Sequence, residues 1–391
     1  SKQLLARILP EHDNHLSLWA ATQHYLLTKN QNWLRKAAPD IVKSAEWIAK
    51  ERAKTKTLEN DIKPAHYGLI PESSPFDGSR KDYWYWTDAF CYAGLMSAAD
   101  VLSEIGLDAD SARLAHEAED YRKCILESVE HSINTNCTPP FLPPGPYMSE
   151  TPSADYMVAT GYPVLSPVCL VEAGILDAKD QKVHYANYWT EKFGLCSGLC
   201  ALEEIHPHYI YNQALSQLLR GETDKFVWTF YSLFAYGQSR TTYTTASRNN
   251  IITGYTGSAW DESQPDTYSN SRVLDMLRIA LLVEDGSTLH LLPGTPRRWL
   301  SDGKQIEIKK APTYFGEVNL TAVSSVKSGD VRITIDPPVK ETAEIILHVR
   351  PPVRYGYIRE VTVNGKPWKD FKKQSVNLGK ISGKTEVICC F

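Results

Sequence analysis

The hydrophobic pattern of the chain changes near residue 286. Before this point, apolar residues recur at the spacing of helices, and loops rich in proline and glycine separate the helical segments. After it, short runs of alternating apolar and polar residues are separated by Gly, Pro, Asn and Asp. Because the two periods belong to different structures, we predict a helical domain at 1–285 and a β domain at 286–391.

The first domain is predicted to be all-α. Ile41, Ala45 and Ile48 recur at the spacing of a single helical face, and Gly106 marks the end of a later helix. The expected helices cover residues 16–27, 33–54, 83–105, 109–133, 157–173, 179–193, 209–220, 225–236 and 270–283. Long helices that alternate with loops, without strands between them, favour antiparallel helical hairpins.

The second domain is predicted to be an antiparallel β-sandwich. Runs such as QIEIKKA, DVRITIDPP and AEIILHVRPP alternate apolar and polar residues, as half-buried strands do. The sequence VNGKPW contains the pair Asn364 and Gly365, which favours a two-residue hairpin turn, because both central positions of such a turn need a positive φ.

The composition argues against several kinds of partner. The net charge is -4 and no dense basic run occurs, so we expect no nucleic-acid partner. No apolar stretch is long enough to span a bilayer and the first residues do not form a signal peptide, so we expect no membrane partner. The eight cysteines contain no CxxC pair, which favours buried free thiols over a disulfide framework or a zinc site. The compartment stays open, with a periplasmic or secreted location slightly favoured over the cytoplasm.

Two stretches carry specific motifs. The first, YLLTKNQNWL at 25–34, is a turn between paired helices with the pattern Y-x-L-T-x-N-x-x-W-L. The second, LHLLPGTPRRW at 289–299, opens the first strands after the helical region. Both resemble the corresponding segments of the six-hairpin glycosidases related to the α-L-rhamnosidases.

This resemblance implies an (α/α)6 toroid followed by a β-sandwich. It also implies hydrolysis of a glycosidic bond in an oligo- or polysaccharide, usually with inversion, by paired carboxylates and without a cofactor. A closed ring of six hairpins requires twelve helices, more than the ranges given above. Either short helices lie in the loops, or a preceding segment or a partner chain completes the ring; the helical start at Leu16 favours the second explanation.

The sequence departs from the family pattern where catalysis is concerned. Rhamnosidase-like enzymes carry a general acid near the start of the barrel, in a region that we expect to precede this chain. They also carry a general-base Glu shortly after a Thr-Thr pair, but here the run SRTTYTTASRNN places Thr245, Ala246 and Ser247 at that point. The candidate catalytic residues are therefore acids in the aromatic-rich loops.

The first candidate group lies in LIPESSPFDGSRKDYWYWTDAF. Sugar rings have apolar faces and hydroxyl edges, so a saccharide site needs aromatic platforms beside hydrogen-bonding groups. Glu72 and Asp88 are candidate catalytic residues, and the candidate binding residues are Asp77, Trp84 and Trp86. Trp84 and Asp88 are four residues apart and share a helix face. The alternative is that Asp88 satisfies amides at the helix start and that the rings belong to the core.

The second group lies in HPHYIYNQ, where His208, Tyr209 and Asn212 are predicted to bind sugar hydroxyls at a helix start. His206 and His208 are two residues apart and do not meet on a helix, so we expect no metal site. A role in capping and packing is an equal alternative.

The third group lies in GYTGSAWDESQPD, close in sequence to the position of the absent base. Glu262 or Asp261 is predicted to take the base role there, and Trp260 to contact the substrate. A solvated acidic loop is the alternative. Arg240, beside the Thr-rich run, is predicted to bind a carboxylate or sulfate on the sugar, or to pair with a local acid.

Three functions compete. The first is a glycoside hydrolase acting on an α-linked deoxy sugar or a uronic-acid-containing oligosaccharide. The second is a polysaccharide lyase or unsaturated-uronyl hydrolase on the same toroid, with Tyr209 and His208 as proton-transfer groups. The third is a non-catalytic carbohydrate-binding or assembly subunit, which the absent carboxylate near Thr245 and the incomplete set of helices favour.

Overall fold

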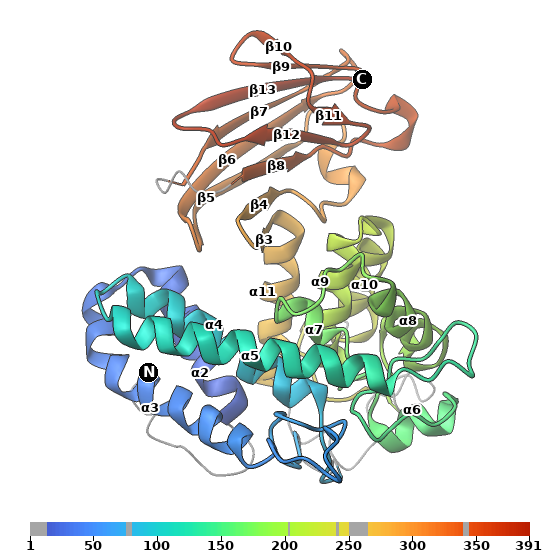
Figure 1. Ribbon diagram of the computed structural model, residues 1–391. Helices are drawn as coiled ribbons and strands as arrows, with labels where there is room; N and C mark the ends of the chain where they lie inside the picture. Colours follow the sequence, from blue (N-terminus) through green and yellow to red (C-terminus); the bar gives the residue numbers. More distant parts are fainter. Residues whose placement is uncertain (1–13, 76–79, 202–203, 240–241, 250–264, 339–343) are drawn as a thin grey trace. The chain divides into compact units, whose positions relative to one another are not determined.

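The computed structural model describes residues 14–75, 80–201, 204–239, 242–249, 265–338 and 344–391 (Figure 1). The chain divides into two compact units. The helical unit comprises residues 1–221 and 231–272, and the sandwich unit comprises residues 222–230 and 273–391. The domain boundary expected at residue 285 stays a prediction.

Four long helices open the helical unit: α2 (Asn14–Thr28), α3 (Gln31–Ala53), α4 (Tyr85–Ser103) and α5 (Asp108–Ser132). The Asn30 side chain accepts a hydrogen bond from the Trp33 amide at 3.0 Å and so caps the start of α3. Helix α4 is apolar around most of its circumference, and it packs against α2 and α5 (Figure 1). A helix of this kind must be buried on several sides, which makes α4 the centre of this part of the core.

Shorter helices follow, which are α6 (Ala154–Thr160), α7 (Cys169–Glu172), α8 (Gln181–Trp189) and α9 (Tyr211–Leu219). Helices α10 (Thr223–Tyr236) and α11 (Thr267–Leu281) each contribute residues to both units. None of the described helices is both long and apolar enough to cross a membrane. Closure of the helices into a ring stays a prediction.

Two expectations for the middle of the helical unit are wrong. Residues 157–173 do not form one helix, because Gly161 adopts a left-handed conformation with φ 62° and ends α6, and two prolines follow. A strand pair, β1 (Leu195–Cys196) and β2 (Leu199–Cys200), interrupts the helices. Its turn uses Ser197 and Gly198, both with positive φ.

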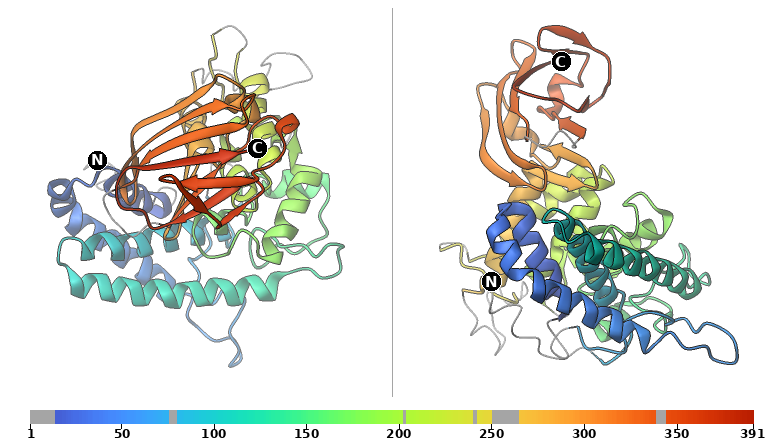
Figure 2. Two further views of the ribbon diagram at one scale, coloured as in Figure 1. Left: turned by 90° about the horizontal axis from the view of Figure 1, so that it is seen from above. Right: turned by 60° about the vertical axis from the view of Figure 1, so that its left-hand side comes forward.

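The sandwich unit contains two sheets. Their strands are β3 (Leu282–Asp285), β4 (Thr288–Leu291), β5 (Gln305–Thr313), β6 (Gly316–Ser325), β7 (Asp330–Asp336), β8 (Glu344–His348), β9 (Glu360–Val363), β10 (Lys366–Trp368), β11 (Phe371–Lys372), β12 (Ser375–Gly379) and β13 (Thr385–Cys390). One sheet has the order β10-β9-β13-β7-β6-β5 and the other the order β11-β12-β8-β4-β3. Figure 2 shows these strands from two further directions.

The inward side chains of both sheets form one apolar core, as in a β-sandwich. Along β7, Val331, Ile333 and Ile335 are buried while the residues between them are not, which is the alternation that the sequence predicts. The hairpin predicted at Asn364 and Gly365 is confirmed, with φ values of 50° and 74°. The sheets are not purely antiparallel, because β4 pairs with β8 in parallel.

Candidate functional site

A cluster of histidine and tyrosine rings lies in the helical unit where the chain enters α9. The 3₁₀ helix Pro207–Ile210 begins with proline, whose fixed φ suits a helix start. The His208 ring lies 4.0 Å from the Tyr209 ring and 5.0 Å from the Tyr268 ring of α11, between ring centroids. The His206 ring lies 6.1 Å from that of His208. The fold thus brings His208 and Tyr209, from the second predicted group, next to α11, which lies about sixty residues later in the chain.

A chain of hydrogen bonds links His208 to a carboxylate. The Asp266 oxygen Oδ2 accepts from the Ser269 amide at 2.8 Å and from the Ser269 hydroxyl at 2.5 Å, so Asp266 caps α11. The Ser269 hydroxyl lies 3.1 Å from His208 Nδ1 and 3.1 Å from the Ala246 carbonyl oxygen. Because the short bond to the carboxylate takes the hydroxyl proton, His208 Nδ1 donates to Ser269 and Nε2 is left as an acceptor.

Both histidines are neutral at pH 7. Burial, with a smaller contribution from the positive charge of Arg248, lowers the pKa of His206 to about 4. Burial also lowers the pKa of His208 to about 4, with a smaller contribution from His206. Neutral imidazoles beside phenol rings offer hydrogen-bonding groups and flat surfaces without a cation, which suits a sugar with hydroxyl groups.

Asp266 lies against the run in which the family pattern places its general base. Its amide donates to the Thr245 carbonyl oxygen at 3.0 Å, and the Thr245 hydroxyl lies 3.1 Å from the Asp266 carbonyl oxygen. Among the residues that the structure describes, nothing donates to the second carboxylate oxygen, Oδ1. The half-buried carboxylate is therefore fixed through one oxygen, while the other has no donor among the described residues.

Asp266 is not among the catalytic residues that the sequence predicts. The sequence contains one signal that could have identified it, the helix-start pattern Asp266-x-x-Ser269, in which the acid caps the helix. Asp266 also lies close in sequence to the predicted acids Asp261 and Glu262. This pattern indicates a structural role by itself. The proximity to Thr245 and His208 comes from segments distant in sequence and becomes visible only in the fold.

A guanidinium group completes this cluster. Arg272 donates to the Tyr268 hydroxyl at 2.8 Å, and its Cζ atom lies 4.8 Å from the Tyr268 ring centroid and 5.2 Å from that of Tyr211. Stacking on both rings holds the guanidinium in place. Asn212, the third predicted binding residue of this group, is half-buried in α9. Five other predicted residues lie outside the described residues, which are Glu262, Asp261, Trp260, Asp77 and Arg240.

The first predicted group separates into a buried part and an exposed part. Trp84, Trp86 and Asp88 are buried, with Asp88 entirely closed to solvent. This burial favours the alternative in which the rings belong to the core. Asp88 does not satisfy amides of its own helix, because Oδ1 accepts from the Ile70 amide at 2.9 Å and from the Tyr121 hydroxyl at 2.5 Å. Within the described residues, Oδ2 has no hydrogen-bond partner.

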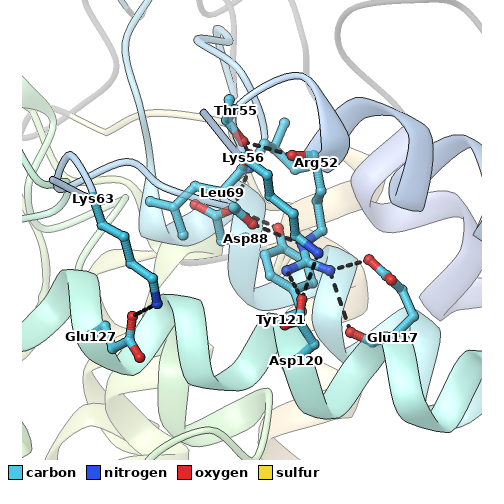
Figure 3. Close-up of polar contacts among 12 residues, drawn as sticks. Arg52, Thr55, Lys56, Lys63, Leu69, Asp88, Glu117, Asp120, Tyr121 and Glu127 are labelled. Carbon is cyan, nitrogen blue, oxygen red and sulfur yellow. Dashed lines mark hydrogen bonds and ion pairs between the residues drawn. The ribbon is translucent and has the colours of Figure 1, made fainter. Parts of the chain in front are cut away.

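Asp88 belongs to a network centred on buried Arg52 (Figure 3). The Arg52 guanidinium lies 3.9 Å from the Tyr121 ring centroid, and Tyr121 in turn holds Asp88. Arg52 Nε donates to the Gly68 carbonyl oxygen at 2.8 Å, and its terminal nitrogens pair with Glu117 and, at 3.0 Å, with Asp120. This network ties α3, α4 and α5 to the loop that carries Glu72.

The pH dependence of stability is expected to report the state of Asp88. Burial raises its pKa from 3.8 to about 7, despite the hydrogen bonds from Tyr121 and Ile70. The folded state then holds a proton that the unfolded state releases, so the contribution is present below pH 4 and is lost as the pH rises to 7, by about 4 kcal/mol. The buried histidines, whose pKa values are lowered, add stability over part of the same pH range, so the protein is compared with Asp88→Asn. Urea unfolding between pH 4 and 8 should show the free energy of unfolding of the protein falling relative to that of Asp88→Asn. The buried histidines contribute equally to both proteins, so parallel curves would contradict the prediction.

Glu72, the exposed member of the first group, lies near His66 and Tyr83, two of three clustered rings that the sequence did not single out. The rings of His66 and Tyr83 stack, with centroids 4.5 Å apart and an angle of 19° between their planes. His66 Nδ1 lies 2.6 Å from the Tyr147 hydroxyl. Burial raises the pKa of Tyr83, and the charge of Glu72 raises it further, which places this carboxylate near the ring. The catalytic role of Glu72 stays a prediction.

No known protein family and no curated protein sequence matches the chain. Solved structures do resemble it. A protein described as a sialidase is 13% identical and aligns with 96% of this chain and 32% of its own, with a TM-score of 0.54. An α-L-rhamnosidase of Streptomyces avermitilis in complex with L-rhamnose is 14% identical and aligns with 96% of this chain and 32% of its own, with a TM-score of 0.46. An α-L-rhamnosidase of Dictyoglumus thermophilum is 10% identical and aligns with 96% of this chain and 39% of its own, with a TM-score of 0.41.

Of these three, the sialidase is similar enough to establish a shared fold. The resemblance to glycoside hydrolases that the two sequence motifs indicate is thus confirmed at the level of the fold. The chain spans 32% of the sialidase and 32% to 39% of the two rhamnosidases. Fold similarity does not by itself carry activity or substrate to this chain.

Proposed function

We propose that the chain forms the saccharide-binding and hydrolytic part of a glycoside hydrolase. The observation that carries this proposal is the Asp266 carboxylate, fixed by Ser269 next to the neutral His208 ring and the two tyrosine rings that flank it. Aromatic surfaces, neutral hydrogen-bonding groups and an oriented carboxylate are what a glycosidase requires at one place. The shared fold agrees with this assignment.

In this proposal Asp266 acts as the general base of an inverting hydrolysis. Oδ1 takes a proton from a water molecule, whose oxygen attacks the anomeric carbon as the bond to the leaving oxygen breaks. A second carboxylic acid protonates the leaving oxygen, and Glu262, Asp261 and Glu72 are the candidates that the sequence supplies. Inversion requires the two carboxyl groups to lie roughly 6.5–9.5 Å apart, so that the water fits between them and the sugar.

A panel of chromogenic glycosides tests this function. The panel contains α-L-rhamnosides, uronides and other aryl glycosides, and we expect turnover of at least one member. NMR spectra recorded before the product mutarotates should show a sugar whose anomeric configuration is opposite to that of the substrate. Glu262→Gln, Asp261→Asn and Glu72→Gln identify the acid. The variant that lacks the acid should lose activity on substrates with a poor leaving group and keep it on substrates whose leaving group departs without protonation. Glu119→Gln on α5 is the control, since that carboxylate is exposed and pairs with exposed Lys123.

A non-catalytic saccharide-binding protein is the second candidate. It is favoured by Thr245, whose hydroxyl lies 2.7 Å from the Asn270 side chain where the family pattern has a carboxylate. This function would be selected over hydrolysis if the protein binds a sugar but turns over no member of the panel, and if Asp266→Asn binds that sugar with the same affinity.

A further inference from the structure

The sandwich unit contains a hollow that the proposed function does not use. It has a volume of about 400 Å³, at the lower end of the range of small-molecule sites. Its lining comes from the end of α11, from the 3₁₀ helix Arg297–Leu300 and from the start of β5. The lining residues are Leu281, Arg298, Trp299, Lys304, Gln305 and Ile306.

Two of the lining residues are exposed cations, Arg298 and Lys304. Neither has an ion-pair partner among the residues that the structure describes. The acids nearest to them in sequence are engaged elsewhere, because Asp302 pairs with Lys327 and Glu307 pairs with Lys309 at 2.9 Å. Two unpaired cations at one hollow create a local positive potential on a chain whose net charge is negative.

The rest of the lining is suited to a sugar ring. Trp299 is half-buried, and its indole packs edge-on against Phe230 with 6.2 Å between centroids, which fixes the ring at the wall. Ile306 is buried and Leu281 half-buried, so the hollow also has apolar walls. Gln305 adds a side chain that both donates and accepts hydrogen bonds.

We propose that this hollow is a second saccharide site, which binds a sugar residue that carries a carboxylate. The indole and the aliphatic side chains contact the apolar face of the ring, while Arg298 and Lys304 bind the carboxylate and Gln305 binds a hydroxyl. A neutral sugar leaves both cations without a partner, and a simple inorganic anion leaves the apolar walls unused. The site therefore selects an anionic saccharide. This binding does not depend on hydrolysis in the helical unit.

Calorimetric titration with digalacturonate tests the site in an Asp266→Asn background, which keeps the ligand intact if the helical unit also binds it. We expect digalacturonate to bind and galactobiose, the neutral analogue, to bind at least about tenfold more weakly. The double variant R298A/K304A should lose at least about tenfold in affinity for digalacturonate. The matched control K366A/K369A, which removes two exposed cations elsewhere on the sandwich unit, should bind as the parent does.

Several results would overturn the second site. Equal affinity for galactobiose would show that the charge is not recognised, and unchanged affinity of R298A/K304A would place binding elsewhere. An equal loss in K366A/K369A would reduce the effect to overall charge. Equal affinity for inorganic sulfate would leave an anion site without saccharide recognition. W299F keeps an aromatic ring at this position but reduces its flat surface, so it should weaken the binding of digalacturonate and leave that of sulfate unaffected. Turnover by the protein that retains Asp266 tests the catalytic proposal separately.

Discussion

Replacing Asp266 with Asn is expected to lower kcat by about a thousandfold on any glycoside that the protein hydrolyses, with little change in KM. Removal of a general base costs between about a hundredfold and ten-thousandfold in rate, because the attacking water keeps its proton in the transition state. An amide at this position is not basic, but its oxygen still accepts from the Ser269 amide at the start of α11. Steady-state kinetics on the best member of the glycoside panel measures the effect.

Two controls separate catalysis from folding in this experiment. Asn is as good a helix cap as Asp, so the stability of Asp266→Asn should fall by less than about 1 kcal/mol. Ser269→Ala removes the hydroxyl between Asp266 and His208 while it keeps both carboxylate oxygens, so it should lower kcat less and should change the pH profile. Full activity of Asp266→Asn, together with a large loss in Glu262→Gln or Asp261→Asn, would move the base to the predicted acids of the same loop.

The parts of the fold that the sequence predicts are those with a clear local signal. The period of the apolar residues predicts α3 and α5, and the alternation predicts the strands of the sandwich unit. Where the local signal is mixed, the prediction fails. Residues 157–173 contain enough apolar side chains for a helix, but Gly161 ends α6 after seven residues. The parallel pairing of β4 with β8 depends on strands that lie between them in sequence and pair in the other sheet.

The candidate site is less predictable because its contacts join distant segments. His208 and Ser269 are 61 residues apart, and Tyr121 lies 33 residues from Asp88. Residue type predicts that His208 and Tyr209 are chemically useful, but it does not indicate that Asp266 lies beside them. Trp84 and Asp88 show the opposite case, in which a chemically suggestive pair belongs to a helix so apolar that it is buried.

Replacing Arg52 with Met is expected to reduce the free energy of unfolding by about 3–5 kcal/mol, because breaking a buried ion pair leaves its remaining partners without compensation. The Arg52 side chain is fully buried, and its loss leaves the Gly68 carbonyl oxygen and the Glu117 carboxylate without this donor. Asp120 loses the guanidinium and keeps Lys56 at 2.7 Å. Methionine nearly fills the volume of the aliphatic part, so the loss measures the guanidinium contacts. Urea unfolding followed by circular dichroism gives the change.

Lys63→Met is the matched control for this substitution (Figure 3). Lys63 also pairs with a carboxylate of α5, Glu127, at 2.9 Å, but both side chains are about half exposed. Water already solvates that pair, so its removal should cost less than about 1 kcal/mol. Arg52→Lys should fall between the two, because one ammonium group cannot reach Gly68, Glu117 and Asp120 together as the planar guanidinium does. Equal effects of Arg52→Met and Lys63→Met would show that the buried network does not hold α3, α4 and α5 together.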